Sequence, residues 1–287
     1  MGYSIGVGIG GSGGSPALAW AAEQTDWTHT PLVLVHVCPP GSPLEHLTGG
    51  PAPAELELID PPLARAYAKT RARVGGQRVS LRIFGGDPSD RLAEASAGVR
   101  LLVIGAGAGG RTVRRVLRQA HCPVVVARAT PPPASRALFG GHVVIGVDGS
   151  SSSQTAMEFA ARYADEHRLP LAAVHVSAAS SDDHIYDDVT LSTQFTTEPA
   201  ARELLADATE PWTVRCPAMP IRRAVLHGPV IEALTRAGVG ARLLVVGDKR
   251  RGVIGRARTG DVPLTVATEA SCPVAVVPEH QHETGPL

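Results

Sequence analysis

The stretch Val143-Val-Ile-Gly-Val-Asp-Gly-Ser150 joins an apolar run to a glycine–serine turn, and apolar side chains recur at helical spacing through residues 151–168. An apolar run without alternation is typical of a parallel strand that is buried on both faces. The spacing that follows it is that of an amphipathic helix. The stretch therefore predicts a strand followed by a helix, the first unit of a parallel α/β sheet with right-handed crossovers.

The rest of this half alternates between strand and helix in the same way. We expect strands at 171–176, 221–226, 243–246 and 274–277, and helices at 230–236 and 261–270. A short helix is expected from Pro199, because proline suits a first helical position. Parallel sheets bind ligands beyond the carboxyl ends of their strands, so the loops after the first and fourth strands are where chemistry is expected.

The first half of the chain repeats this pattern. Four segments recur in the same order: Ile5–Ser12 with Val143–Ser150, His36-Val37 with His175-Val176, Arg100–Gly105 with Arg242–Gly247, and Cys122–Val126 with Cys272–Val276. Self-similarity of this kind indicates a duplication. The offset between the repeats grows by eight residues between Gly105 and Cys122, so the first repeat is shorter in that loop.

The 287 residues suit two domains. We place the first at 1–128, a proline-rich linker at 129–140, the second domain at 141–279 and a polar tail at 280–287. Proline-rich linkers favour an extended conformation that resists packing, which supports this boundary.

Composition excludes several classes of protein. Lys and Arg number 27 and Asp and Glu number 27, which argues against a nucleic-acid binder and a polybasic membrane-surface protein. The apolar runs are strand-sized, and the first Lys or Arg is Arg65, so we expect no membrane span and no secretory leader. The four cysteines show no metal-type spacing, which favours reduced thiols in a cytoplasmic protein. Cys122 and Cys272 are expected to be packing residues.

Two motifs carry a family resemblance. The opening motif of the universal stress protein family, in its tandem form, resembles Gly146-Val-Asp-Gly-Ser150. Its closing motif resembles Leu244-Val-Val-Gly247 followed by a long loop to Gly260 and by Ser271-Cys-Pro-Val274. The resemblance implies a bacterial stress-response protein of two Rossmann-like, adenine nucleotide alpha hydrolase-like domains. Each domain would hold a five-stranded parallel sheet with helices on both faces. The last strands of the two repeats would pair as an intramolecular pseudo-dimer, and a further homodimer or a protein partner stays open.

Many members of that family bind ATP through the pattern G-x2-G-x9-G-[S/T]. Gly247 and Gly260 keep its spacing, whereas Arg250 stands at the second glycine and Asp261 at the final Ser or Thr. The resemblance places Asp148 near the ribose or a metal, and the end of the second strand near the adenine. The nucleotide site that it implies, for ATP with Mg or another adenine nucleotide, consists of Val147, Asp148, Gly149, Ser150, His175, Val176, Gly247, Arg250, Gly260, Asp261 and Val262.

The closing loop departs from the family pattern in its charges. Asp261 is a good helix N-cap and would place a carboxylate where a phosphate should lie. Pro263 removes one amide from the same turn. Two interpretations of the basic residues Lys249, Arg250, Arg251, Arg256 and Arg258 stay open: they hold a phosphate by charge, or they form a solvated loop.

The first repeat lacks the features of a nucleotide site. Gly10 stands where the second repeat has Asp148, and Gly105-Ala-Gly-Ala-Gly-Gly110 runs almost directly into the last helix. A loop of this length can hardly surround a triphosphate. We therefore expect nucleotide binding in the second repeat alone.

Other constellations compete with this interpretation. Gly6-x-Gly8-x-x-Gly11 matches a dinucleotide fingerprint but lacks its acidic partner after the second strand. Gly10-Gly-Ser12-Gly-Gly14 matches a nucleophile elbow but follows the first strand, where no earlier strand supplies an oxyanion hole. His184 lies among Asp182, Asp183, Asp187 and Asp188, which indicates an acidic mobile loop or, as an alternative, a metal site. His36 and His175 end equivalent strands, either as hydrogen-bonded core rings or as pocket residues.

Three functions follow from these observations. The first is a stress-response regulatory protein that holds an adenine nucleotide in the second domain. The second is a nucleotide-free scaffold or interaction protein whose pockets have decayed. The third is a slow ATPase, for which the sequence offers no pair of nucleophile and general base, so we expect no enzyme.

Overall fold

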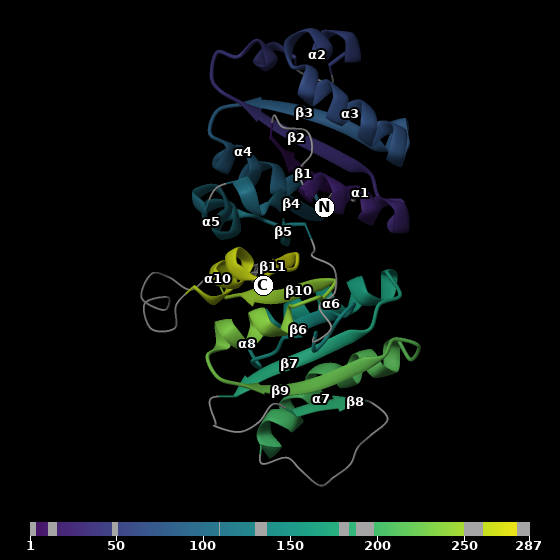
Figure 1. Cartoon of the computed structure of the whole chain (residues 1–287), viewed down its shortest axis with the longest axis vertical. Coiled ribbons are helices and arrows are strands. Elements are labelled where there is room, and N and C mark those ends of the chain that lie inside the picture. The colour runs from purple at the N-terminus through teal and green to yellow at the C-terminus, as the bar shows by residue number, and fades with distance from the viewer. Residues whose placement is uncertain are drawn as a thin grey trace, which may run out of the picture. The chain divides into compact units, whose positions relative to one another are not determined.

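In a computed structural model, the chain folds as two compact units, Met1–Ala129 and Thr130–Leu287, and each unit is an α/β layer structure (Figure 1). The structure describes residues 4–10, 16–47, 51–108, 110–129, 137–177, 184–187, 198–249 and 261–279, with the backbone alone for 184–187. Residues 130–136 of the expected linker and the tail from 280 onward lie outside these ranges.

The first unit contains a parallel five-stranded sheet. Its strands are β1 (Ile5–Ile9), β2 (Leu32–Cys38), β3 (Val79–Gly85), β4 (Leu101–Gly105) and β5 (Val124–Ala127), in the order β3-β2-β1-β4-β5. Its helices are α1 (Pro16–Thr28), α2 (Pro53–Ile59), α3 (Pro61–Val74), α4 (Pro88–Ala95) and α5 (Gly110–Gln119). Helices α1 and α3 pack together, as do α4 and α5, so that the sheet lies between two helical layers (Figure 1).

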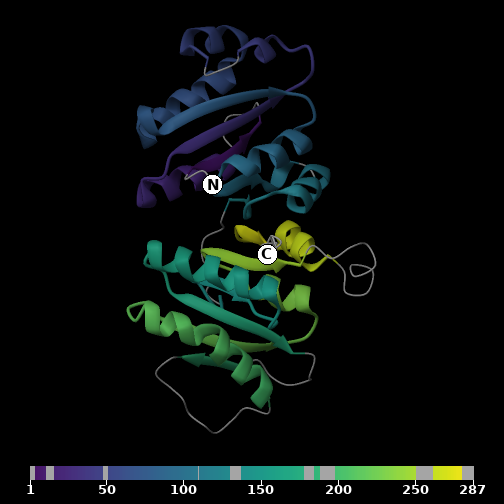
Figure 2. The same ribbon diagram turned by 180° about the vertical axis from the view of Figure 1, so that it is seen from behind.

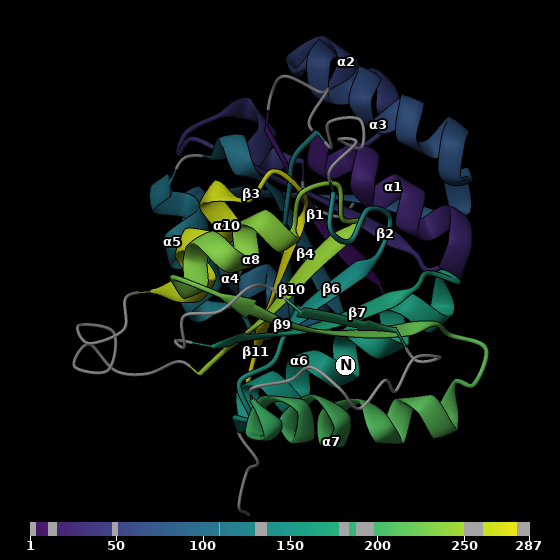
Figure 3. The same cartoon turned by 60° about the horizontal axis from the view of Figure 1, so that its bottom comes forward.

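The second unit repeats this arrangement. Its parallel strands are β6 (Val143–Gly146), β7 (Leu171–Ser177), β9 (Ile221–His227), β10 (Leu243–Asp248) and β11 (Val274–Pro278), in the order β11-β10-β6-β7-β9. The helices are α6 (Ser151–Glu166), α7 (Pro199–Arg215), α8 (Val230–Ala237) and α10 (Val262–Glu269). Figure 2 shows α6 and α7 on the near face of this sheet, and Figure 3 shows α8 and α10 on the opposite side.

The second sheet has one strand more than the sequence predicts. Residues His184–Asp187 form β8, which pairs antiparallel with β9, so the prediction of a loop at His184 and Asp187 is wrong. The reason lies in the partner: β9 would otherwise be an edge strand, and an open edge accepts any short extended segment. Asp182, Asp183 and Asp188 lie outside the described residues.

The core is largely aliphatic. The first four residues of β4 and of β10 are buried throughout, which is the pattern of parallel strands covered on both faces. The four cysteines, all of which are described, form no disulfide; Cys122 and Cys272 are buried, as expected of packing residues, and Cys38 is buried as well. No helix in the described ranges is long and apolar enough to cross a membrane.

One helix is much longer than expected. Helix α7 runs for 17 residues and contains Pro211, where the sequence predicts only a short helix. Its apolar stripe is weak because buried Thr209 takes a core position and satisfies its own hydroxyl by donating to the Leu205 carbonyl at 2.7 Å. Periodicity based on apolar residues alone therefore underestimates this helix.

The short connection in the first repeat is confirmed. Strand β4 ends at Gly105, a single 3-10 turn covers Ala106–Ala108, and α5 begins at Gly110. The corresponding connection of the second repeat runs from Asp248 to Val262. The two units therefore differ at the sheet edge where a phosphate loop would lie.

Candidate functional site

A cavity of about 360 Å³ opens at the carboxyl ends of β6, β7 and β10 in the second unit. These strands lie side by side in the order β10-β6-β7, so the cavity sits where the strand order reverses. Seven of the eleven predicted site residues line it: Val147, Asp148, His175, Val176, Gly247, Asp261 and Val262. Gly149 and Ser150 belong to the adjoining turn, and Arg250 and Gly260 lie outside the described residues.

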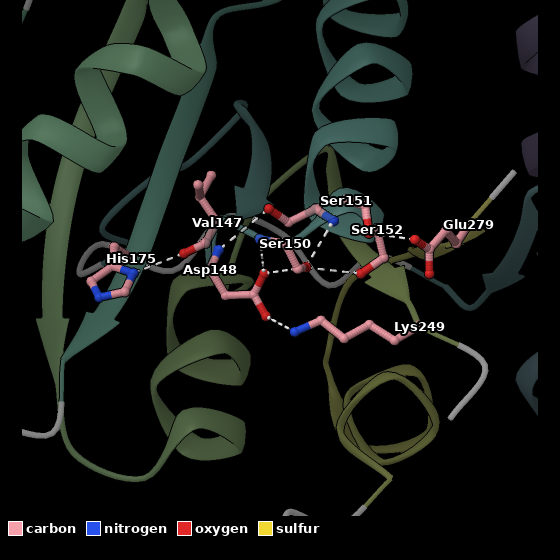
Figure 4. A network of polar contacts seen from close by, with 9 residues as sticks. Val147, Asp148, Ser150, Ser151, Ser152, His175, Lys249 and Glu279 are labelled. Carbon is pink, nitrogen blue, oxygen red and sulfur yellow. Dashed lines mark hydrogen bonds and ion pairs between the residues drawn. The ribbon is translucent and has the colours of Figure 1, made fainter. Parts of the chain in front are cut away.

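Asp148 lines the cavity, and a polar network holds its side chain in place. Figure 4 shows this network. Its Oδ1 accepts a hydrogen bond from the backbone N–H of Ser150 at 3.0 Å and another from the Ser150 hydroxyl. Its Oδ2 lies 2.7 Å from Nζ of Lys249, which extends from the end of β10. The Ser150 hydroxyl in turn caps α6 by accepting from the N–H of Ser153 at 3.3 Å.

The environment of Asp148 keeps its carboxylate charged. Partial burial works to raise the pKa of Asp148, but the hydrogen bonds from Lys249 and Ser150, together with the charge of Lys249, outweigh it and lower the pKa below 3.8. At neutral pH, the cavity therefore presents an ionised acceptor next to a lysine. This combination is suited to sugar hydroxyls on one side and an anion on the other.

The His175 side chain is held by the backbone just after β6. Its Nδ1 lies 2.8 Å from the carbonyl oxygen of Val147, so Nδ1 carries the proton and donates (Figure 4). The first unit has the same contact, in which Nδ1 of His36 lies 3.2 Å from the carbonyl oxygen of Ile9. The interpretation as hydrogen-bonded rings is confirmed for both histidines. His175 also lines the cavity, so it is both a hydrogen-bonded ring and a pocket residue.

Gly247 has a packing role that the family pattern does not indicate. A Cβ added there would lie 2.4 Å from the carbonyl oxygen of Ser152 and 3.1 Å from the backbone nitrogen of Ser153. The first turn of α6 therefore presses directly on β10. At the equivalent Gly105 of the first unit, the nearest contact would be the Ala17 Cβ at 4.0 Å.

The prediction that Asp261 caps its helix is wrong. Asp261 takes the N-cap position of α10, but its side chain makes no capping hydrogen bond. Its backbone angles, φ −94° and ψ 71°, differ from the extended conformation that lets an N-cap side chain reach back to the first amides. The Asp261 carbonyl accepts from the N–H of Thr265 at 2.9 Å, and the residue borders the cavity.

Sequence reasoning missed an apolar wall of the cavity. Val230 and Leu234, one turn apart on α8, line it, and Val230 is 45% exposed. An apolar residue at the start of a helix that follows a strand's carboxyl end is the signal that could have found them. Ser152, Ser153, Asp248 and Pro263 also line the cavity without having been predicted as site residues.

The competing motifs receive no support from the described residues. Gly6 and Gly8 lie within β1 and face side chains of Val99, Leu102 and Leu92, so they are not the turn of a dinucleotide site. Residues 11–14 of the nucleophile-elbow motif lie outside the described ranges. The alternative metal site around His184 falls on side chains that the structure does not describe; among the side chains that it does describe, no group of three or more His, Cys, Asp or Glu is placed to hold a metal ion.

Comparisons with known proteins identify the family and the fold. Two Mycobacterium tuberculosis proteins, universal stress proteins Rv2623 and Rv2005c, are each 29% identical to this chain, over 92% and 96% of both chains respectively. The crystal structure of a universal stress protein from Archaeoglobus fulgidus DSM 4304 superposes with a TM-score of 0.65 over 98% of both chains at 14% identity, which shows a shared fold. The profile of the "Universal stress protein family" matches residues 3–128 and again 141–278, and the chain therefore belongs to the universal stress protein family.

Proposed function

We propose that the second unit binds an adenine nucleotide in the cavity between β6, β7 and β10, and that the chain acts as a regulatory binding protein. The observation that carries the proposal is the convergence of seven predicted site residues on one cavity of about 360 Å³. Cavities of about 300–1,000 Å³ are those that bind small molecules and cofactors.

The walls of the cavity divide into an apolar and a polar part. Val147, Val176 and Leu234 offer aliphatic surface of the kind on which a purine ring packs. Asp148 and Lys249 supply an ionised acceptor and a cation at 2.7 Å from one another. A ligand with a flat apolar base, sugar hydroxyls and a phosphate matches this division.

A magnesium ion would enter with the phosphates of the nucleotide. Mg²⁺ usually keeps several waters and binds one or two carboxylates besides phosphate oxygens. Asp248 and Asp261 also line the cavity, but we assign this role to Asp148, whose Oδ2 Lys249 already engages. Binding of Mg²⁺ by Asp148 would therefore require Lys249 to move.

The first unit is not expected to share this function. Gly10 and Gly107 occupy the positions equivalent to Asp148 and Lys249, and a Cβ at either glycine would meet nothing within 4 Å. The unit thus carries neither the acceptor nor the cation. Pairing of the two repeats, a further homodimer and a protein partner stay predictions from the resemblance, and a cytoplasmic location stays a prediction from the cysteines.

Calorimetric titration of ATP into the full chain, with and without Mg²⁺, tests the proposal. We expect one site per chain, lost in Asp148→Ala and retained in Asp207→Ala, which removes an exposed carboxylate from α7. Absence of heat, with no thermal stabilisation at millimolar ATP, would favour the nucleotide-free scaffold instead. Phosphate release that disappears in Asp148→Ala would instead favour the ATPase, for which we propose no mechanism.

The two lysines provide an independent readout. Lys69 on α3 and Lys249 are the lysines of the sequence. An amine-reactive label followed by mass spectrometry therefore reports on each separately. Nucleotide should protect Lys249 and leave Lys69 unchanged; equal labelling of Lys249 with and without ATP would count against a ligand in this cavity.

A further inference from the structure

The two partners of the Asp148–Lys249 pair are held unequally. The Asp148 carboxylate is anchored through Oδ1, which accepts from both the N–H and the hydroxyl of Ser150. Ser150 is itself fixed as the N-cap of α6. Lys249 instead reaches Asp148 on a four-carbon stem with rotatable bonds, from the residue directly after β10. If the pair opens, the lysine is the side chain that moves.

Separating the Asp148–Lys249 ion pair also costs little free energy. The side chain of Asp148 is 54% exposed and that of Lys249 is 29% exposed. Ion pairs with this degree of solvent contact contribute little to stability, because water screens their attraction and ordering the lysine costs entropy. A phosphate that reaches Nζ can therefore replace the carboxylate without a large penalty.

We propose that Lys249 is the phosphate-recognising residue of the cavity and that Asp148 is its built-in competitor. A phosphate oxygen of the ligand takes the place of Asp148 Oδ2 at the Lys249 ammonium. The released Oδ2 then accepts a hydrogen bond from a sugar hydroxyl of the same ligand. The inference rests on the proposed function and narrows the ligand to a nucleotide, since a nucleoside has no group that can replace the carboxylate.

The short distance between the two charges favours a ligand that carries both groups. Nζ and Oδ2 are 2.7 Å apart before binding, so the phosphate and the hydroxyl must lie close together in the ligand. A 5′-phosphate and the ribose that carries it satisfy this condition. Inorganic phosphate would take the lysine but leave Asp148 Oδ2 without a replacement donor from the ligand.

Titration of adenosine and AMP into the full chain and two variants tests the inference. Wild type should prefer AMP by about tenfold, the usual effect of a hydrogen bond to a charged group. Lys249→Met should remove that preference, with adenosine binding unchanged or tighter because Asp148 loses its competitor. Asp148→Asn should weaken the binding of adenosine and increase the preference for AMP, because Lys249 is then available to the phosphate. Lys69→Met, the matched control on α3, should behave as wild type.

The outcomes separate this inference from the proposed function. Equal losses of adenosine and AMP affinity in Lys249→Met would show that the lysine merely maintains the site, which would overturn the inference and leave the nucleotide site intact. A smaller AMP preference in Asp148→Asn than in wild type would overturn the competitor role. If neither ligand bound wild type, both proposals would be wrong. Thermal unfolding of each variant verifies that the loss does not come from misfolding.

Discussion

Nζ of Lys249 lies 2.7 Å from Oδ2 of Asp148, although the two residues are 101 positions apart in the chain. The contact exists because β10 and β6 are neighbours in the sheet, with Leu243 in register with Val143 and Val245 with Ile145. Both strands end at the same edge, so the residues that follow them meet. The charge of the cavity is therefore set by strand order, which places these two loops together.

Acid should remove the contribution of Asp148 to stability. Its pKa in the folded chain lies below 3.8, so the stabilisation is present above that value and is lost as the pH falls through the folded pKa. Asp148→Asn should lower the free energy of unfolding at pH 7 by less than about 1 kcal/mol, because the side chain is half exposed. Urea unfolding at pH 7 and pH 3 measures this; an equal loss at both would contradict the ionised carboxylate.

Substitution of equivalent glycines should affect the two units differently. Gly247→Ala forces a Cβ against the backbone of Ser152 and should destabilise the second unit by about 1–3 kcal/mol. Gly105→Ala in the first unit meets its nearest atom at 4.0 Å and should be tolerated. Denaturant unfolding of both variants gives the comparison. Similar effects at the two positions would contradict the packing role of Gly247.

Removal of either histidine ring should leave a backbone carbonyl without its donor. We expect His175→Ala, which frees the Val147 carbonyl, to cost about 1–3 kcal/mol in unfolding free energy. His36→Ala should have a comparable cost through the Ile9 carbonyl. Asparagine places an amide N–H near the position of Nδ1, so His175→Asn should restore part of the stability. No recovery by asparagine would indicate that the ring acts through packing alone.

Glu198 should anchor the start of α7 in a pH-dependent way. Hydrogen bonds from Ser177 and then His227 lower the pKa of Glu198 below 4.5, and Nε2 of His227 lies 3.0 Å from its Oε1. The anchoring is present above pH 4.5 and is lost as the pH falls through the folded pKa. Glu198→Gln should speed amide exchange in the first turn of α7 at pH 7. Unchanged exchange would show that the helix start is held by other contacts.

The sequence predicted the parallel strands of the second repeat to within about two residues, because most of them are apolar runs; β9 is the exception, with Arg222 and Arg223 directly after Ile221. It failed at β8, where residues His184–Asp187 have no apolar pattern of their own and are ordered by the edge of β9. It also underestimated α7, whose buried Thr209 interrupts the apolar stripe. Both failures concern elements stabilised by tertiary contacts, which local patterns do not contain.

At the site, motif spacing identified which residues converge but not what several of them do. Asp148 and His175 could be placed because they directly follow or end predicted strands. The partner of Asp148 could not be predicted, since Lys249 was one of five basic residues in a loop of unknown path. The missing cap at Asp261 depends on backbone angles that residue identity does not determine.

The contact between Gly247 and the first turn of α6 bears on how this site could change over evolutionary time. Selection for a correctly packed sheet would retain this glycine even in a descendant that no longer met its ligand. Lys249 has no comparable packing role among the described residues. It could be replaced as soon as ligand binding was no longer under selection. In a descendant of this protein, replacement of Lys249 rather than of Gly247 would therefore be the first sign that the cavity no longer binds the same ligand.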